Sequence, residues 1–190
     1  MPNWLKVVAA AVLGALGSFA LLQYMDGREI QKPQDGAIAI TRGPGEGGWT
    51  RWVPGHLMTS KADAEETGGA YSLLEVLLTG EGPPQHIHKT EDEAFYVLEG
   101  ELDVKRGEET LHASAGAFLM IPRGTIHTVW NTGSTPAKTL AIFSPPGFEE
   151  YFLDTGSEDR EPDKAAYIEK AMAVSEKHNL EIVGPPLSSP

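Results

Sequence analysis

The stretch that decides the fold is residues 86–100, which read HIHKTEDEAFYVLEG. Side chains two residues apart on a β-strand point to the same side, so His86 and His88 can converge on one ion while Ile87 points away. A short polar turn follows, and Glu93 begins the next apolar run, from which it can return a carboxylate to the same point. The stretch therefore predicts two strands and most of a metal site.

A second stretch offers a further ligand. Residues 116–131 read GAFLMIPRGTIHTVWN, and His127 follows the turn at 122–124. On a strand of the same inner face, His127 would complete a set of three imidazoles and one carboxylate. The chain has no cysteine, so thiolate sites and cysteine nucleophiles are excluded. The remaining ligand types suit a divalent transition metal, and the sequence does not rank Fe, Mn, Ni, Co, Cu and Zn.

Short apolar runs separated by glycine and proline recur along the chain, which is typical of an all-β sandwich or barrel. The predicted strands lie at 37–40, 49–53 and 71–78, on either side of Gly100 within 94–107, and at 109–113, 118–121, 127–131 and 138–144. After Pro162, apolar residues at helical spacing predict one C-terminal helix over 163–179.

The N-terminal segment is a separate problem. No charged residue occurs between Val7 and Leu22, and Lys6 precedes this run. Residues 1–25 therefore read as a signal peptide or a membrane anchor, with a buried or interfacial helix as the alternative. We expect an N-terminal hydrophobic helix, a linker at 26–36, and a domain exported or anchored outside the cytoplasm; under the alternative the protein is cytoplasmic.

The length and net charge of the chain limit the classes of partner that we expect. A chain of 190 residues suits one domain, and its net charge of −12 argues against a nucleic-acid partner, which would require a basic surface. A membrane partner is expected only through residues 1–25, if they are not cleaved.

The two quoted stretches resemble the two motifs of the cupin superfamily. Gly80 to Gly100 fits glycine, five residues, H-x-H, four residues, glutamate, six residues, glycine; Gly116 to Asn131 fits glycine, five residues, P-x-G, two residues, histidine, three residues, asparagine. The resemblance implies a double-stranded β-helix, or jelly roll, over 37–155, with a C-terminal helix and tail at 156–190. Residues 67–69 and 144–152 are similar to quercetin 2,3-dioxygenase-like single-domain cupins.

The resemblance implies a metal on His86, His88, Glu93 and His127, and an activity of the quercetinase type. That activity is dioxygen addition to a hydroxylated aromatic or enolisable small molecule, and in such cupins the glutamate equivalent to Glu93 is thought to act as a base. Two other classes stay open: a metal-dependent isomerase, lyase or hydrolase that uses no dioxygen, and a non-catalytic small-molecule-binding cupin. A homodimer through an exposed edge strand such as 37–40 is also compatible with the family.

The remaining expectations concern the walls of the site and the other polar residues. We interpret Glu91 and Asp92 as solvated charges and Arg123 as an ion-pair partner, with contact to an anionic substrate as the alternative. The other histidines are expected at the surface or in loops: His56, His112 and His178. The candidates for lining an apolar substrate pocket are Tyr71, Phe95, Met120 and Phe143.

Overall fold

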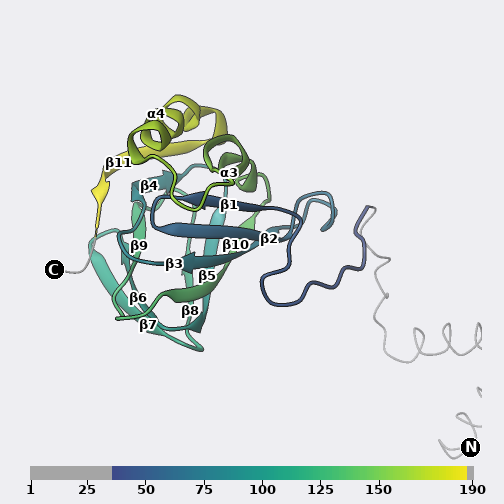
Figure 1. Cartoon of the computed structure of the whole chain (residues 1–190), viewed down its shortest axis with the longest axis horizontal. Helices are drawn as coiled ribbons and strands as arrows, with labels where there is room; N and C mark the ends of the chain where they lie inside the picture. The colour runs from purple at the N-terminus through teal and green to yellow at the C-terminus, as the bar shows by residue number, and fades with distance from the viewer. Residues whose placement is uncertain (1–35, 188–190) are drawn as a thin grey trace, which may run out of the picture. The chain divides into compact units, whose positions relative to one another are not determined.

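The fold is a pair of antiparallel sheets, seen in a computed structural model that describes residues 36–187 (Figure 1). The six-stranded sheet has the order β1 (Thr50–Val53), β2 (His56–Ala62), β3 (Ser72–Leu78), β10 (Ala137–Ser144), β5 (Asp92–Glu99) and β8 (Phe118–Ile121). The five-stranded sheet has the order β11 (Leu180–Pro186), β4 (Pro84–His88), β9 (His127–Asn131), β6 (Glu101–Arg106) and β7 (Glu109–Ser114). This architecture is the predicted jelly roll.

The core lies between the two sheets because the strands alternate buried and less buried residues. In β3 the buried positions are Ser72, Leu74, Val76 and Leu78, and β5 and β10 alternate in the same way. Leu102, Val104 and Val129 contribute from the five-stranded sheet to the same apolar cluster. One face of each sheet therefore lines the interior in which the candidate site lies.

The β5–β6 junction moves the chain from one sheet to the other at a single glycine. Gly100 has a φ of 77°, and a Cβ at this position would lie 2.9 Å from the Cα of Ala137. Only glycine combines this backbone conformation with so close an approach of two chains. The predicted pair of strands around Gly100 is confirmed by β5 and β6.

Most of the other predicted strands are also confirmed, but the one at 37–40 is wrong. Residues 37–40 form no strand and are exposed; the backbone N–H of Ile38 bonds the carbonyl of Glu66, which lies in a loop. A four-residue apolar run beside Gly36 has no neighbouring strand to pair with there. The candidate dimer edge at 37–40 is therefore not a sheet edge, and the six-stranded sheet ends at β1 instead.

The C-terminal region differs from the single predicted helix. It contains α4 (Lys164–Val174), whose N-cap Asp163 accepts a hydrogen bond from the N–H of Ala166, then the 3-10 helix η1 (Glu176–His178) and β11. A further helix, α3 (Glu149–Thr155), precedes α4. The two helices pack against each other at one end of the sandwich (Figure 1), and β11 pairs with β4. The C-terminal region thus helps to enclose the strand that carries His86 and His88.

The hydrophobic helix predicted at residues 1–25, with its reading as signal peptide or anchor, lies outside the described residues. Within residues 36–187, none of the helices combines the length and the apolar character of a membrane span.

Candidate metal centre

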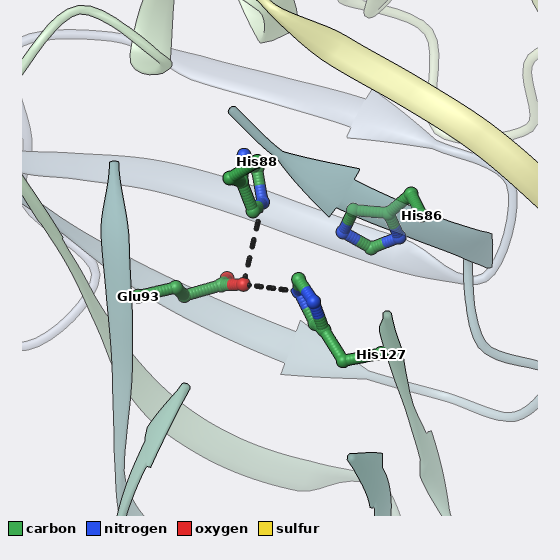
Figure 2. Close-up of side chains that lie close together, drawn as sticks. All are labelled: His86, His88, Glu93 and His127. Carbon is green, nitrogen blue, oxygen red and sulfur yellow. Dashed lines mark hydrogen bonds and ion pairs between the residues drawn. The ribbon is translucent and has the colours of Figure 1, made fainter. Parts of the chain in front are cut away.

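Four side chains from three strands meet in the interior (Figure 2). β4 contributes His86 and His88, β9 contributes His127, and β5 contributes Glu93 from the opposite sheet. All four are buried, and one ligand atom from each lies within 4.8 Å of the others. The register explains the meeting, because His86 pairs directly with His127 and Glu93 faces inward on β5.

Glu93 is the centre of this cluster. Its Oε2 lies 2.8 Å from Nε2 of His127 and 3.4 Å from Nε2 of His88. The rings of His86 and His127 are 4.2 Å apart between centroids, and those of His86 and His88 are 5.0 Å apart. The structure thus brings together the four predicted ligand residues around one point.

Backbone carbonyls fix the orientation of two of the imidazoles. Nδ1 of His86 donates to the carbonyl of Pro84 at 2.7 Å, and Nδ1 of His127 donates to the carbonyl of Thr125 at 3.0 Å. In each case the acceptor lies two residues earlier in the chain. Such outer hydrogen bonds fix which nitrogen carries the proton, and they leave Nε2 for the centre of the cluster.

The third imidazole, His88, has a carboxylate on its outer side. Glu91 Oε2 lies 3.9 Å from its Nδ1, both groups are buried, and Oε1 of Glu91 accepts a hydrogen bond from Thr90. The expectation that Glu91 is a solvated charge is wrong, because Glu91 is buried, whereas Asp92 stays partly exposed and forms a two-pronged ion pair with Arg123. The expected ion pair of Arg123 is confirmed.

The charges within the cluster favour metal binding at two of its members, Glu93 and His86. Burial opposes ionisation of Glu93, but its hydrogen bond with His127 and its contact with His88 outweigh burial and lower the pKa of the carboxyl group. Burial, with the neighbouring His127 and His88, holds the pKa of His86 well below its usual value. These shifts favour an anionic Glu93 and a neutral His86, the forms in which these side chains bind metals. Burial lowers the pKa of His127, but its hydrogen bond with Glu93 outweighs burial and raises that pKa, so a metal at Nε2 of His127 would displace a proton.

Buried polar atoms that lack a hydrogen-bond partner indicate whether a metal fits the cluster. Nδ1 and Nε2 of His88 are buried without a hydrogen-bond partner among residues 36–187, and so is Oε2 of Glu91. Leaving a buried polar group unpaired costs about 1–3 kcal/mol. A cation bound at Nε2 would remove part of this cost, and three nitrogens with one carboxylate suit a divalent transition metal. The residues present fit a single metal ion of that class.

An apolar cavity of about 330 Å³ adjoins the cluster. Phe95 and Phe143 line it, as do the four cluster residues. Tyr71 and Met120 are not brought to this cavity, and their side chains are 43% and 47% exposed. Met120 does not reach the cavity because of its position on β8. It pairs with Ala94, whereas its neighbour Ile121 pairs with the inward-facing Glu93.

Two of the histidines expected at the surface are buried. His56, at the start of β2, is 4% exposed and lines the cavity, whereas His178 is 9% exposed and lies 2.7 Å from a carboxylate oxygen of Asp154. His112 is exposed as expected and contacts Asp103. No spacing in the sequence links His56 to the cluster residues, because they line the same cavity from strands distant in the chain.

Sequence reasoning also missed the aromatic residues that α3 brings to the cavity. Phe148, the N-cap of α3, packs edge-on against His88 with ring centroids 4.1 Å apart, and stacks on Tyr151 at 5.2 Å. Phe148, Tyr151 and Phe152 recur at helical spacing. That periodicity is the signal that could have revealed a helix covering the site.

Residues 73–143 match the family model described as the cupin domain. The chain is 28% identical over 134 residues to quercetin 2,3-dioxygenase of Bacillus subtilis (strain 168), which covers 67% of this chain and 38% of that protein. It is 29% identical over 100 residues to the tetracenomycin polyketide synthase protein TcmJ of Streptomyces glaucescens, covering 53% of this chain and 63% of that protein.

Among solved structures, KdgF from Halomonas sp. is similar with a TM-score of 0.46 and 21% identity, over 52% of this chain and 87% of that chain. The chain spans only 38% and 63% of the length of the two curated relatives. The family match falls on the strands that carry the paired motifs, and both motifs meet at one buried cluster. Residues 73–143 therefore match the cupin domain, and the chain is similar to quercetin 2,3-dioxygenase.

Proposed function

We propose that this protein is a metal-dependent cupin oxidoreductase, a dioxygenase that acts on a hydroxylated aromatic or enolisable small molecule. The observation that carries the proposal is the placement of His86, His88, Glu93 and His127 at the wall of an apolar cavity. A divalent transition metal at this site would lower the pKa of a bound hydroxyl and make the substrate more reactive toward dioxygen.

The three imidazoles would hold the ion, and Glu93 has a second role in the proposal. Its Oε2 makes the contacts with His127 and His88, and neither contact involves Oε1. A carboxylate that binds through one oxygen can accept a proton with the other. We propose that Glu93 removes the proton from the substrate hydroxyl, which is the role of the equivalent glutamate that the quercetinase resemblance implies.

The walls of the cavity select the body of the substrate. Leu74, Val76, Phe95 and Phe143 line it and are all buried. Such a surface offers an aromatic ring favourable contacts and excludes water from the reacting atoms. The match to quercetin 2,3-dioxygenase supports the same substrate class.

Oxygen uptake tests this function. The full chain, loaded in turn with each candidate metal, is assayed with a panel of flavonols in air and under argon. We expect flavonol consumption with matching oxygen uptake in air and none under argon. Equal conversion under argon would assign the isomerase, lyase or hydrolase class, and binding without turnover with every metal would assign a binding module.

The Glu93→Gln variant tests the proposed role of Glu93 as a base. The amide keeps an oxygen ligand but cannot accept the proton, so we expect bound metal with turnover lowered by about 10²-fold or more. Elemental analysis of the same sample separates a lost base from a lost metal. Turnover equal to that of the unaltered protein would rule out the base role.

A further inference from the structure

His56 provides a second polar point in the cavity, outside the metal cluster. It begins β2, is 4% exposed, and lines the same cavity as Glu93. Its Nδ1 lies 3.0 Å from the carbonyl oxygen of Pro54. A carbonyl can only accept, so Nδ1 carries the hydrogen and donates it.

The other ring nitrogen of His56 has no partner. Nε2 is buried and makes no hydrogen bond to any of residues 36–187. Burial lowers the pKa of His56 and keeps the ring neutral. With the proton on Nδ1, Nε2 is an acceptor, and an unpaired buried acceptor is costly. The ring is therefore prepared for a hydrogen-bond donor that the described part of the chain does not supply.

The sheet register places His56 and Glu93 at opposite ends of the inner face. His56 pairs with Leu78 at the end of β3, whereas Glu93 pairs with Phe143, which pairs with Ser72 at the start of β3. Leu78 and Ser72 are six residues apart, which is about 20 Å of strand. The cavity-lining residues of β3 between these levels are Leu74 and Val76. An apolar surface therefore separates the two polar points.

The charged groups near His56 form an ion pair that carries no net charge. Glu81 also lines the cavity, and its carboxylate acts electrostatically on His56. Lys164 lies 2.6 Å from Glu81, with which it forms an ion pair. Beside this neutral pair, an acceptor such as Nε2 favours a neutral hydroxyl group, whereas a carboxylate on the ligand has no hydrogen to donate to it.

We propose that Nε2 of His56 binds the far end of the substrate by accepting a hydrogen bond from a neutral hydroxyl group. The substrate class is then an apolar aromatic molecule with one hydroxyl at the metal cluster and a second at the opposite end. This inference rests on the proposed function in taking the cavity as the substrate site. It assigns to His56 a role in substrate selection, separate from metal binding.

Three probes with one shared methylphenyl body test the proposal: p-cresol, toluene and p-toluate. They differ only in carrying a hydroxyl group, no polar group or a carboxylate. Each is titrated into the ¹⁵N-labelled full chain after removal of bound metal with a chelator, so that no probe binds through an ion at the cluster, and both the affinity and the ¹⁵N shift of His56 Nε2 are recorded. The variant His56→Phe removes the acceptor. Met58→Leu is the matched control, because Met58 lies two residues further along β2 and also lines the cavity.

We expect p-cresol to bind about three- to tenfold more tightly than toluene, the factor that one net hydrogen bond contributes. Only p-cresol should move the Nε2 signal upfield, as accepting a hydrogen bond does. His56→Phe should abolish the preference, Met58→Leu should keep it, and p-toluate should bind more weakly than p-cresol. Equal binding of p-cresol and toluene, an unmoved Nε2 signal, or a preference that survives in His56→Phe would overturn the proposal.

The Nε2 signal decides the question in the unaltered protein even if His56→Phe fails to fold. The experiment involves neither turnover nor dioxygen. A negative flavonol assay would therefore refute the proposed activity without changing these results, and a failure at His56 would leave the oxygen-uptake result standing.

Discussion

At the scale of single residues, the site depends on the group that faces Nδ1 of each imidazole, the ring nitrogen on the outer side of the cluster. His86 and His127 use backbone carbonyls, which no substitution of a side chain removes, whereas the outer nitrogen of His88, Nδ1, lies 3.9 Å from the Glu91 carboxylate. A carboxylate behind a metal-binding histidine fixes the ring and raises its basicity. Glu91 is therefore the outer residue of this site that mutation can test.

We expect Glu91→Gln to weaken metal affinity about 10- to 100-fold, the usual effect of losing such a carboxylate. Competition with a chelator, followed by elemental analysis, measures it. Glu108→Gln is the control, because Glu108 is an exposed carboxylate in the turn after β6. If Glu91→Gln and Glu108→Gln bind metal equally well, Glu91 does not position His88.

The residue scale also shows the limit of sequence reasoning. Strand phase correctly separates Glu93, which faces inward, from its neighbours, since the i, i+2 rule depends only on local backbone geometry. The burial of Glu91 could not be predicted, because Glu91 lies in the turn before β5, where no periodicity applies. The unpaired Nε2 of His56 could not be predicted either, because only tertiary contacts determine which atoms surround it.

At the scale of elements, the junctions between strands depend on particular residues. A side chain at Gly100 would meet both an unfavourable backbone conformation and the backbone of Ala137, whereas one at Gly107 would meet only the first, since no described atom lies within 4 Å. We expect Gly100→Ala to lower the free energy of unfolding by about 1–3 kcal/mol, and more than Gly107→Ala does. Urea unfolding of both variants measures the difference, and equal losses would show that the approach to Ala137 is not limiting.

The segment before β1 is held by an ion pair. Arg42 contacts both carboxylate oxygens of Glu66, at 2.8 and 2.6 Å, and this hydrogen-bonded contact, against a smaller opposing effect of burial, lowers the pKa of Glu66 below its usual 4.5. A carboxylate with a lowered pKa stabilises the fold above its unfolded pKa, and the stabilisation is lost as the pH falls through the folded value.

We therefore expect Glu66→Gln to be less stable than the unaltered protein at pH 7, with a difference that shrinks as the pH falls below about 4.5. Urea unfolding between pH 7 and pH 3 measures this, with the exposed Glu65→Gln as the control. A stability difference that stays constant with pH would show that the charge of Glu66 contributes nothing.

Element by element, predictability followed the regularity of the pattern. β3, β8, β9 and β10 were predicted because each is a short apolar run bounded by turn residues. β11 was not, since LEIVGPP contains a glycine and two prolines and its register against β4 shifts at Gly184. Its partner β4 is about a hundred residues earlier in the chain, so only the folded structure shows the pairing.

At the scale of the whole molecule, the two motifs create one site because each contributes a strand to both facing sheets, and their histidine-bearing strands β4 and β9 are neighbours. β5 of the six-stranded sheet supplies the carboxylate, while β4 and β9 of the five-stranded sheet supply the imidazoles. The helices α3 and α4 and strand β11 add residues to the walls of the cavity, so the C-terminal region takes part in the site. This arrangement places the candidate metal centre at the wall of an apolar cavity.

The most direct test of this account is the metal content of the purified full chain, measured by elemental analysis beside His86→Ala and His112→Ala. His86 is a buried member of the cluster, and His112 is an exposed histidine outside it. We predict one divalent transition-metal ion per chain in the unaltered protein and in His112→Ala, and loss of most of that metal in His86→Ala. A chain that holds no such metal, or a His86→Ala variant that holds as much as the control, would contradict the central claim.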